Sequence, residues 1–286
     1  LIGTFNRDEV LNCCLEFTGP GVAALSIEER MTIANMSTEW GALAAVFPCD
    51  EVTRRHLLER AAVLGRRGPQ PRLTAERVEQ VVRAAPRADA DAFYAKELDF
   101  DLSAVTAFVA GPNEVKTVAA ARDLETKNVR IDKAFLMSCV NGRLQDFAAA
   151  AEVLTDRKIA AHVKFYVAAA SNEVEVLAQE RGYWRILADA GAIFLPPGCG
   201  ACIGLGAGVL ADNEVGISAT NRNFDGRMGS RKSQVYLASP AVVAASAVAG
   251  KIAAPPTQPG ARATGPASTR REQVGAIKLN PRPARG

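Results

Sequence analysis

Histidine, aromatic residues and long apolar runs are scarce in this sequence. Its 286 residues include 2 histidines, and aromatic residues make up 6%. His56 lies in a predicted helix and His162 at the start of a predicted strand, so we expect both to be structural or exposed rather than metal ligands. No apolar run has the length and flanks of a transmembrane helix, and we therefore expect no membrane contact. The alanine-rich run 241–249 is short and predicts a packed helix.

A large excess of charge of one sign is also missing. The chain has 34 Lys and Arg against 31 Asp and Glu, a net charge of +3. Residues 255–286 carry six of the basic residues and one Glu, or +5, so the rest of the chain is close to −2. Nucleic-acid binding usually needs a basic face on a folded element. The charge therefore predicts no nucleic-acid partner.

The six cysteines do not form the compact framework of a small disulfide-rich domain. Free or metal-binding cysteines in a reducing compartment are favoured for a chain of this length. We expect Cys13, Cys14 and Cys49 to be packing residues. No secretory signal or basic presequence opens the sequence, and Leu1 in place of Met indicates a fragment, so these residues predict nothing about location.

The pattern of apolar residues divides the chain into three parts. Residues 1–95 are the first part, in which residues 1–60 predict a globular segment of helices and turns and Ser26 and Glu29 form a capping box. Residues 96–254 alternate strands with helices, which predicts an α/β domain with a mostly parallel, doubly wound sheet. Residues 255–286 contain six prolines and predict a linker or a disordered tail. In the middle part, strands are expected near 133–138, 162–170, 192–196, 215–220 and 234–239, and helices near 144–154, 173–182 and 183–191 and from Pro240.

Three polar loops follow the ends of predicted strands. They contain SCVNGR from Ser138, GCGACIG from Gly198 and NRNFDGR from Asn221. Ligand sites of open α/β sheets gather at the carboxyl ends of the strands. We therefore expect the three loops to contribute to one site.

Cys199 and Cys202 have the spacing at which two thiolates reach one metal or cluster. The neighbouring glycines let the backbone bend closely and offer N–H groups to anionic sulfur. Cys139 is the natural third ligand, because its loop lies at the same sheet end. Three cysteines suit a four-iron cluster with one iron left open to substrate. The spacing also allows zinc, although no second CxxC is present, or buried free thiols.

Asn221, Arg222 and Arg227 lie on the third loop. A guanidinium group binds a carboxylate at two points, so two arginines at a ligand edge suit a di- or tricarboxylate. The alternative is a pair of surface arginines with solvated heads. Their place beside Cys139 and Cys199 favours the carboxylate site.

Together these motifs resemble the aconitase superfamily of iron–sulfur hydro-lyases. The three loops occur in the family's order, and residues 31–48 resemble its upstream segment with a site asparagine and glutamate. The resemblance covers about residues 5–254, is weak around 60–90 and excludes the tail. It implies aconitase-type iron–sulfur domains with three α/β/α layers and mostly parallel sheets, and it makes residues 1–95 part of an N-terminal α/β region that carries Asn35 and Glu39.

The resemblance also implies a reaction and a role for each matching residue. Within the superfamily the chain looks closest to fungal enzymes that hydrate the tricarboxylate cis-homoaconitate reversibly to homoisocitrate, in lysine biosynthesis through α-aminoadipate. That implies a mitochondrial location. The resemblance implies that Cys139, Cys199 and Cys202 bind a 4Fe-4S cluster, which Asn141 and Asn221 line. It implies that Asn35 and Glu39 form hydrogen bonds to the water or hydroxyl at the open iron, and that Arg222 and Arg227 bind substrate carboxylates.

Two departures from the family pattern are present. Val140 and Gly142 stand where relatives often carry hydroxyl residues. The family's catalytic-histidine region and its swivelling domain, with a serine base and a further arginine, have no match in these residues, so we expect weak or no turnover from this chain alone. The alternatives are the same chemistry on isopropylmalate or citrate, and a cluster-free module that binds another molecule such as RNA.

Overall fold

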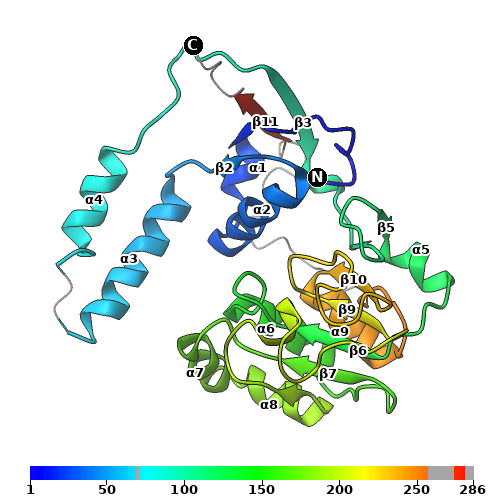
Figure 1. Cartoon of the computed structure of the whole chain (residues 1–286). Coiled ribbons are helices and arrows are strands. Elements are labelled where there is room, and N and C mark those ends of the chain that lie inside the picture. The colour runs from blue at the N-terminus through cyan, green and yellow to red at the C-terminus, as the bar shows by residue number, and fades with distance from the viewer. Residues whose placement is uncertain (69–70, 257–273, 281–286) are drawn as a thin grey trace. The chain divides into compact units, whose positions relative to one another are not determined.

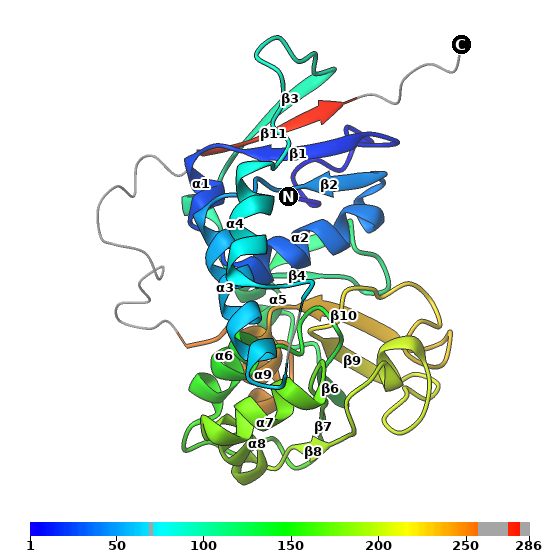
Figure 2. The same cartoon turned by 90° about the vertical axis from the view of Figure 1, so that its left-hand side faces the viewer.

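The computed structural model describes residues 1–68 and 71–256 and the backbone of a strand at 274–280. The described residues fall into two compact units, which Figures 1 and 2 show from two sides. One contains residues 1–7 and 106–256, and the other contains residues 8–105 with the strand at 274–280. None of the helices in these ranges is long and apolar enough to span a membrane.

A seven-stranded sheet lies at the centre of the first unit in the described residues, with strand order β5-β4-β10-β9-β6-β7-β8. The five strands from β10 to β8 run parallel, whereas β4 and β5 are added antiparallel at one edge. The predicted α/β fold with a mostly parallel sheet is therefore confirmed. The strands are β4 (Phe108–Ala110), β5 (Val118–Ala120), β6 (Lys133–Leu136), β7 (Lys164–Val167), β8 (Ile193–Phe194), β9 (Val215–Ser218) and β10 (Gln234–Ala238).

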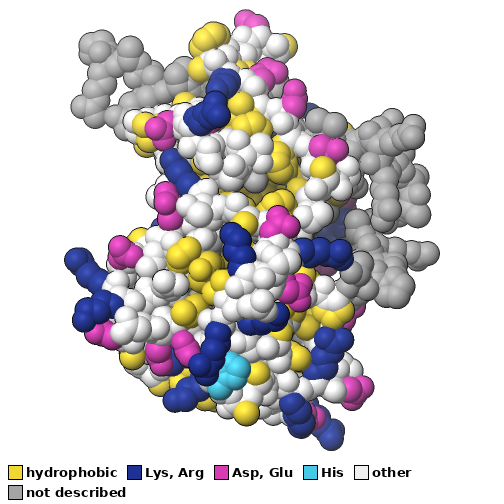
Figure 3. All heavy atoms as spheres, turned by 90° about the vertical axis from the view of Figure 1, so that its right-hand side faces the viewer, with side chains coloured by type: hydrophobic (Ala, Val, Ile, Leu, Met, Phe, Trp, Pro, Cys, Tyr) yellow, Lys and Arg dark blue, Asp and Glu magenta, His cyan; other side chains and the backbone are white. Residues whose placement is uncertain are grey.

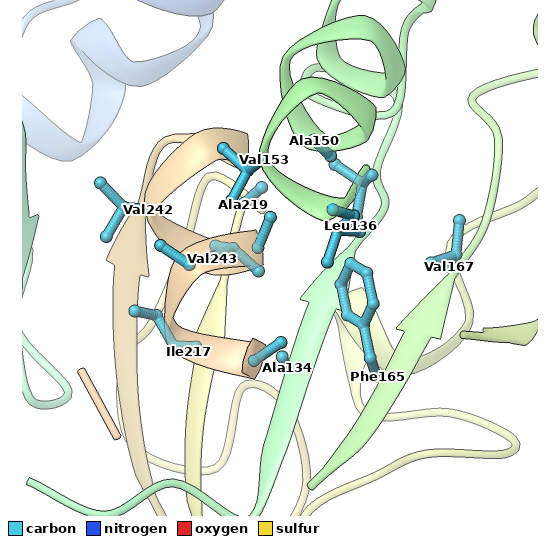
Figure 4. Close-up of a cluster of buried hydrophobic side chains, with 14 of the residues drawn as sticks. Ala134, Leu136, Ala150, Val153, Phe165, Val167, Ile217, Ala219, Val242 and Val243 are labelled. Atoms are coloured by element: carbon cyan, nitrogen blue, oxygen red, sulfur yellow. The ribbon is translucent and has the colours of Figure 1, made fainter. Parts of the chain in front are cut away.

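Helices cover one face of this sheet, as Figure 2 shows. They are α5 (Ala121–Thr126), α6 (Leu144–Leu154), α7 (Asn172–Glu180), α8 (Tyr183–Ala190) and α9 (Pro240–Ala249). α6 packs against both α8 and α9. Ala150 and Val243, on α6 and α9, meet strand residues such as Leu136 and Phe165 in a fully buried apolar cluster (Figure 4). Small alanine and valine side chains let the helices approach the strands closely, which explains the alanine-rich sequences of α6 and α9.

The opposite face of the sheet is covered by an irregular segment with one 3₁₀ helix, η2 (Gly200–Ile203). Alternate strand residues point to this side, so Phe135 and Met137 pack here although their neighbours face the helices. They meet Ala201, Cys202 and Met228 of the covering loops. The second half of the core therefore ties the Cys202 loop directly to the sheet.

The second unit contains a four-stranded sheet, in the described residues, with strand order β2-β1-β11-β3. Its strands are β1 (Cys14–Thr18), β2 (Ala44–Val46), β3 (Lys96–Asp101) and β11 (Val274–Asn280), and its helices are α1 (Pro20–Ala23), α2 (Ile27–Trp40), α3 (Glu51–Gly65) and α4 (Ala75–Arg83), with a 3₁₀ turn η1 (Leu102–Ala104). Within residues 1–60, where the apolar pattern predicts helices and turns, β1 and β2 also form. The boundary expected after residue 95 moves beyond β3, since β3 pairs with β11 inside this unit.

The expectation of a linker or disordered tail at residues 255–286 is wrong at one place. Residues 274–280 form β11, which pairs antiparallel with both β1 and β3. Backbone pairing on both sides overrides the proline-rich and basic composition around the strand. The rest of the predicted tail beyond residue 256 lies outside the described residues.

Candidate functional site

The three predicted loops meet at one edge of the seven-stranded sheet. β6 lies between β9 and β7 in parallel register, and β8 follows β7 in the same direction. The loops begin after Leu136, Phe194 and Ser218, the last residues of β6, β8 and β9. Their placement at a common carboxyl edge, expected from the strand pattern, is confirmed.

Three thiols lie close together at this edge. Cys139 and Cys199 are exposed, whereas Cys202 is 5% exposed and packs against the sheet. Burial raises the pKa of the Cys202 thiol, the nearby Arg227 guanidinium partly opposes that effect, and Cys139 and Cys199 raise the pKa further. The three sulfur atoms are therefore near enough to interact electrostatically.

The thiols do not form a site for a single metal ion. In the part of the chain that the structure describes, no three Cys, His, Asp or Glu side chains gather closely enough to hold one ion. Sulfur ligands of a single tetrahedral zinc ion would stand about 3.8 Å apart, given a Zn–S bond of about 2.3 Å. His162 contacts the backbone instead, since its Nε2 lies 3.2 Å from the carbonyl oxygen of Gly250.

The CxxC loop and the arginine loop approach each other through their backbones. η2 is followed by Gly204, which has φ of 75°, and a Cβ placed there would lie 3.2 Å from the carbonyl oxygen of Arg227. The backbone N–H of Cys202 donates to the carbonyl of Cys199 at 2.9 Å and closes the turn between the two thiols. A residue without a side chain at 204 therefore allows Arg227 to lie next to Cys202.

The first-cysteine loop is equally compact. Val140 is 5% exposed, and a Cβ at Gly142 would lie 2.7 Å from the carbonyl oxygen of Ser138 and 2.9 Å from that of Ala168. The departure from the family pattern at Gly142 thus coincides with a position that has no room for a side chain in this loop. Asn141 is half-buried beside it, and its backbone N–H donates to Ser138 Oγ at 3.0 Å.

The arginine loop holds two buried amides, those of Asn221 and Asn223, and two half-buried arginines. Asn221 is 6% exposed, while Arg222 and Arg227 are half-buried. Nε of Arg227 is buried and has no hydrogen-bond partner among the described residues. The Arg227 guanidinium lies 5.6 Å from the centre of the Phe224 ring. A half-buried guanidinium whose buried Nε has an open donor suits an anionic ligand.

Sequence reasoning missed the residues that anchor this loop. Asn113 donates to Asp225 Oδ1 at 2.7 Å and accepts from the backbone N–H of Val235 at 2.7 Å. Asn223, 2% exposed, donates to the carbonyl of Val235 at 3.1 Å. Arg143 was also missed, and its Nε is buried without a partner in the described part of the chain. The N-x-N-x-D spacing was visible in the sequence, but its partners were not.

Asn35 and Glu39 lie on α2 in the other unit. They are four residues apart, share one helix face and are both half-buried. The helix is held by Arg30, 2% exposed, which donates to both carboxylate oxygens of Asp50 at 2.8 and 2.7 Å. Their meeting with the three thiols stays a prediction.

Comparison with known proteins places the chain in a family. The model of the aconitase family, described as aconitate hydratase, matches residues 1–250. The chain belongs to the aconitase family. This membership implies an iron–sulfur cluster.

Relatives within the aconitase family are named as mitochondrial homoaconitases. The chain is 56% identical over 263 residues to the one from Eremothecium gossypii, covering 89% of this chain and 38% of the relative. It is 50% identical over 280 residues to that of Debaryomyces hansenii, covering 98% and 40%, and 53% identical over 256 residues to that of Yarrowia lipolytica, covering 89% and 37%. The chain thus spans about two fifths of the length of these relatives.

Proposed function

We propose that this chain is the cluster-binding part of a mitochondrial homoaconitase. The complete protein would hydrate cis-homoaconitate reversibly to homoisocitrate in lysine biosynthesis through α-aminoadipate. The observation that carries the proposal is the convergence of Cys139, Cys199, Cys202 and Arg227 at one sheet edge. The names of the similar proteins support both the substrate and the location.

The donor set fits a 4Fe-4S cluster held by Cys139, Cys199 and Cys202. Each sulfur of such a cluster site would bind a different iron, so the thiols would stand further apart than around a single ion. Gly198 and Gly200 flank Cys199, and the small residues of this turn would let a cluster approach the backbone closely. When bound, the cluster supplies a Lewis-acidic iron that makes hydroxide a better leaving group.

The remaining residues would bind and orient the substrate. Arg227, with its open Nε, and Arg222 would hold carboxylates and so fix the carbon that loses its proton. Glu39 would hold and return the proton of the departing or entering water, with Asn35 as a hydrogen-bond partner of that water. Asn141 and Asn221 would donate to the cluster surface. These roles remain proposals for each side chain.

A second candidate keeps the chemistry and changes the substrate. No residue described here separates homoaconitate from isopropylmalate or citrate, so the choice depends on the relatives. A cluster-free module that binds RNA is less well supported. On the face drawn in Figure 3, Lys and Arg side chains are interspersed with Asp and Glu, and no continuous basic area is visible among the described residues.

Anaerobic reconstitution with iron and sulfide tests the proposal on the full chain. We expect about four irons per chain and a cluster signal in electron paramagnetic resonance after mild oxidation, both lost in Cys139→Ser. A folded wild-type chain that takes up no iron would argue against the cluster site. Turnover of the three substrates by the complete protein decides specificity, and fastest use of isopropylmalate would overturn the choice of homoaconitate.

A further inference from the structure

The turn between β6 and α6 contains an unusual backbone conformation. Ser138, directly before Cys139, has φ of 107° and is 2% exposed. This left-handed region is uncommon for a residue that carries a side chain. Such a conformation persists where surrounding contacts determine it, and it is found preferentially at functional sites.

Hydrogen bonds around Ser138 supply those contacts. Its Oγ accepts from the backbone N–H of Val140 at 3.2 Å and from that of Asn141 at 3.0 Å. Its carbonyl oxygen accepts from the N–H of Gly142 at 3.0 Å. One serine thus binds three successive N–H groups directly after Cys139, a local turn that serine hydroxyls form with nearby backbone.

The far end of the turn is fixed to the next strand end. The carbonyl oxygen of Gly142 accepts from the N–H of Ala170 at 2.8 Å, just beyond β7. The lack of space for a Cβ at Gly142 shows how closely the two backbones approach. The turn that carries Cys139 is therefore held at both ends.

Cys139 has no comparable support of its own. Its side chain is exposed, whereas Cys202 is packed against the sheet and Cys199 is joined to it by the short turn of η2. The position of the Cys139 sulfur therefore depends on the backbone that presents it.

We propose that Ser138 is a positioning residue, which holds Cys139 so that its sulfur stays beside those of Cys199 and Cys202. This role deepens the proposed function, because it assumes that the three thiols share one cluster. The hydroxyl acts through the two N–H groups that it binds, and it does not need to touch the cluster or the substrate.

Two substitutions in the full chain separate the hydroxyl from the backbone conformation. Ser138→Ala removes the acceptor and keeps a side chain at positive φ, whereas Ser138→Gly removes the acceptor and adopts that φ freely. Ser171→Ala is the matched control, since Ser171 Oγ also accepts a backbone N–H, from Val174 at 3.3 Å, at the start of α7. Thermal unfolding of each variant reports its stability.

Three measurements follow the position of Cys139. Amide exchange at Val140 and Asn141 should accelerate in both Ser138 variants. Cross-linking of Cys139 to Cys199 or Cys202 in the iron-free chain by dibromobimane, which joins two neighbouring thiols, should fall in both. Iron should bind about 10- to 100-fold more weakly, as for other residues that orient metal ligands. The control should match the wild type in all three.

The outcomes distinguish this inference from the proposed function. Unchanged cross-linking and iron affinity in both Ser138 variants would overturn the positioning role. A loss of cross-linking and iron affinity in Ser138→Ala but not in Ser138→Gly would also overturn it, because the backbone conformation at residue 138, and not the hydroxyl, would then be responsible. If Ser138→Ala does not fold, Ser138→Gly carries the test. A wild-type chain that binds no iron would count against the cluster site, while the cross-linking yields would still decide the role of Ser138.

Discussion

Polar groups at the two ends of the parallel sheet differ in how completely they are hydrogen-bonded. At the amino end, Lys133 Nζ donates to Glu214 Oε2 at 2.6 Å and to the carbonyl of Val209 at 2.8 Å. Asp132 accepts from the backbone N–H of Val215 at 2.9 Å. At the carboxyl end, Arg227 keeps a buried Nε without a partner in the described residues. Polar groups at the amino end therefore stabilise the fold, whereas the carboxyl end leaves a buried donor without a partner in the described residues, where we propose that a ligand binds.

The largest expected effect falls at the carboxyl end. Cys199→Ser should reduce the bound iron from about four per chain to near zero, because a hydroxyl is a poor iron ligand in a cluster. The free energy of unfolding should change by less than about 0.5 kcal/mol, since the Cys199 side chain is exposed. Iron analysis and urea denaturation measure the two quantities. Full iron content in the variant would break the distinction between the two ends.

A change at the amino end should lower the free energy of unfolding and leave the iron content unchanged. Lys133→Met removes the ion-pair partner of Glu214 and should lower the free energy of unfolding by about 2 kcal/mol, with iron content unchanged. Urea denaturation measures the loss. The double variant with Glu214→Gln is the control, and it should recover part of the stability because no charge is left unpaired. Iron loss on Lys133→Met would show that the two ends are coupled.

Removal of Arg227 should raise the pKa of Cys202 and have only a small effect on the free energy of unfolding. Burial raises the Cys202 pKa and Arg227 partly offsets that effect, so Arg227→Gln should raise this pKa further. Alkylation of Cys202 in the iron-free chain should then be slower near pH 8, and the free energy of unfolding should change by less than about 1 kcal/mol. Arg231→Gln, an exposed neighbour, serves as the control. Faster alkylation in Arg227→Gln would contradict the contact.

The smallest expected effect is a pH dependence at the amino end. Burial alone would raise the pKa of Glu214, but Lys133 and the N–H of Ala211 outweigh it and lower that pKa below its ordinary value of 4.5. Glu214 therefore contributes stability above its unfolded pKa, and this stability is lost as the pH falls through the lower folded pKa. Between about pH 5 and 3, unfolding free energies of Lys133→Met should fall less steeply than those of the wild type. Parallel curves would show that Lys133 does not lower this pKa.

The elements predicted well from sequence are those determined by neighbouring residues. The Ser26 capping box forms as expected, with Glu29 N–H donating to Ser26 Oγ at 3.2 Å. The expected helix 144–154 matches α6 at both ends, and Gly191 ends α8 in a left-handed conformation. Caps and helix ends are local interactions, so the sequence contains them within a few positions.

The features that were missed depend on distant partners. β3 is rich in charge and is stabilised as a strand by pairing with β11, from the far end of the chain. Asn113 donates a hydrogen bond to Asp225, which lies 112 positions further along the sequence. Among the thiols, Cys199 and Cys202 were singled out by their spacing and Cys139 by its loop after a predicted strand, but the strand order that places β6 between β9 and β7 is seen only in the fold. No periodicity predicts such contacts, because they exist only in the folded chain.

The pairing of β11 between β1 and β3 has a consequence for the order of events during synthesis. The strands of the seven-stranded sheet lie within residues 108–238, so the ribosome delivers them in one stretch. The four-stranded sheet waits longer, because β11 is made after all strands of the seven-stranded sheet, whereas its neighbours β1 and β3 are made before them. Until residues 274–280 emerge, β1 and β3 have unpaired edges that can join other chains. The first unit can therefore finish folding while the second is still exposed to misassembly.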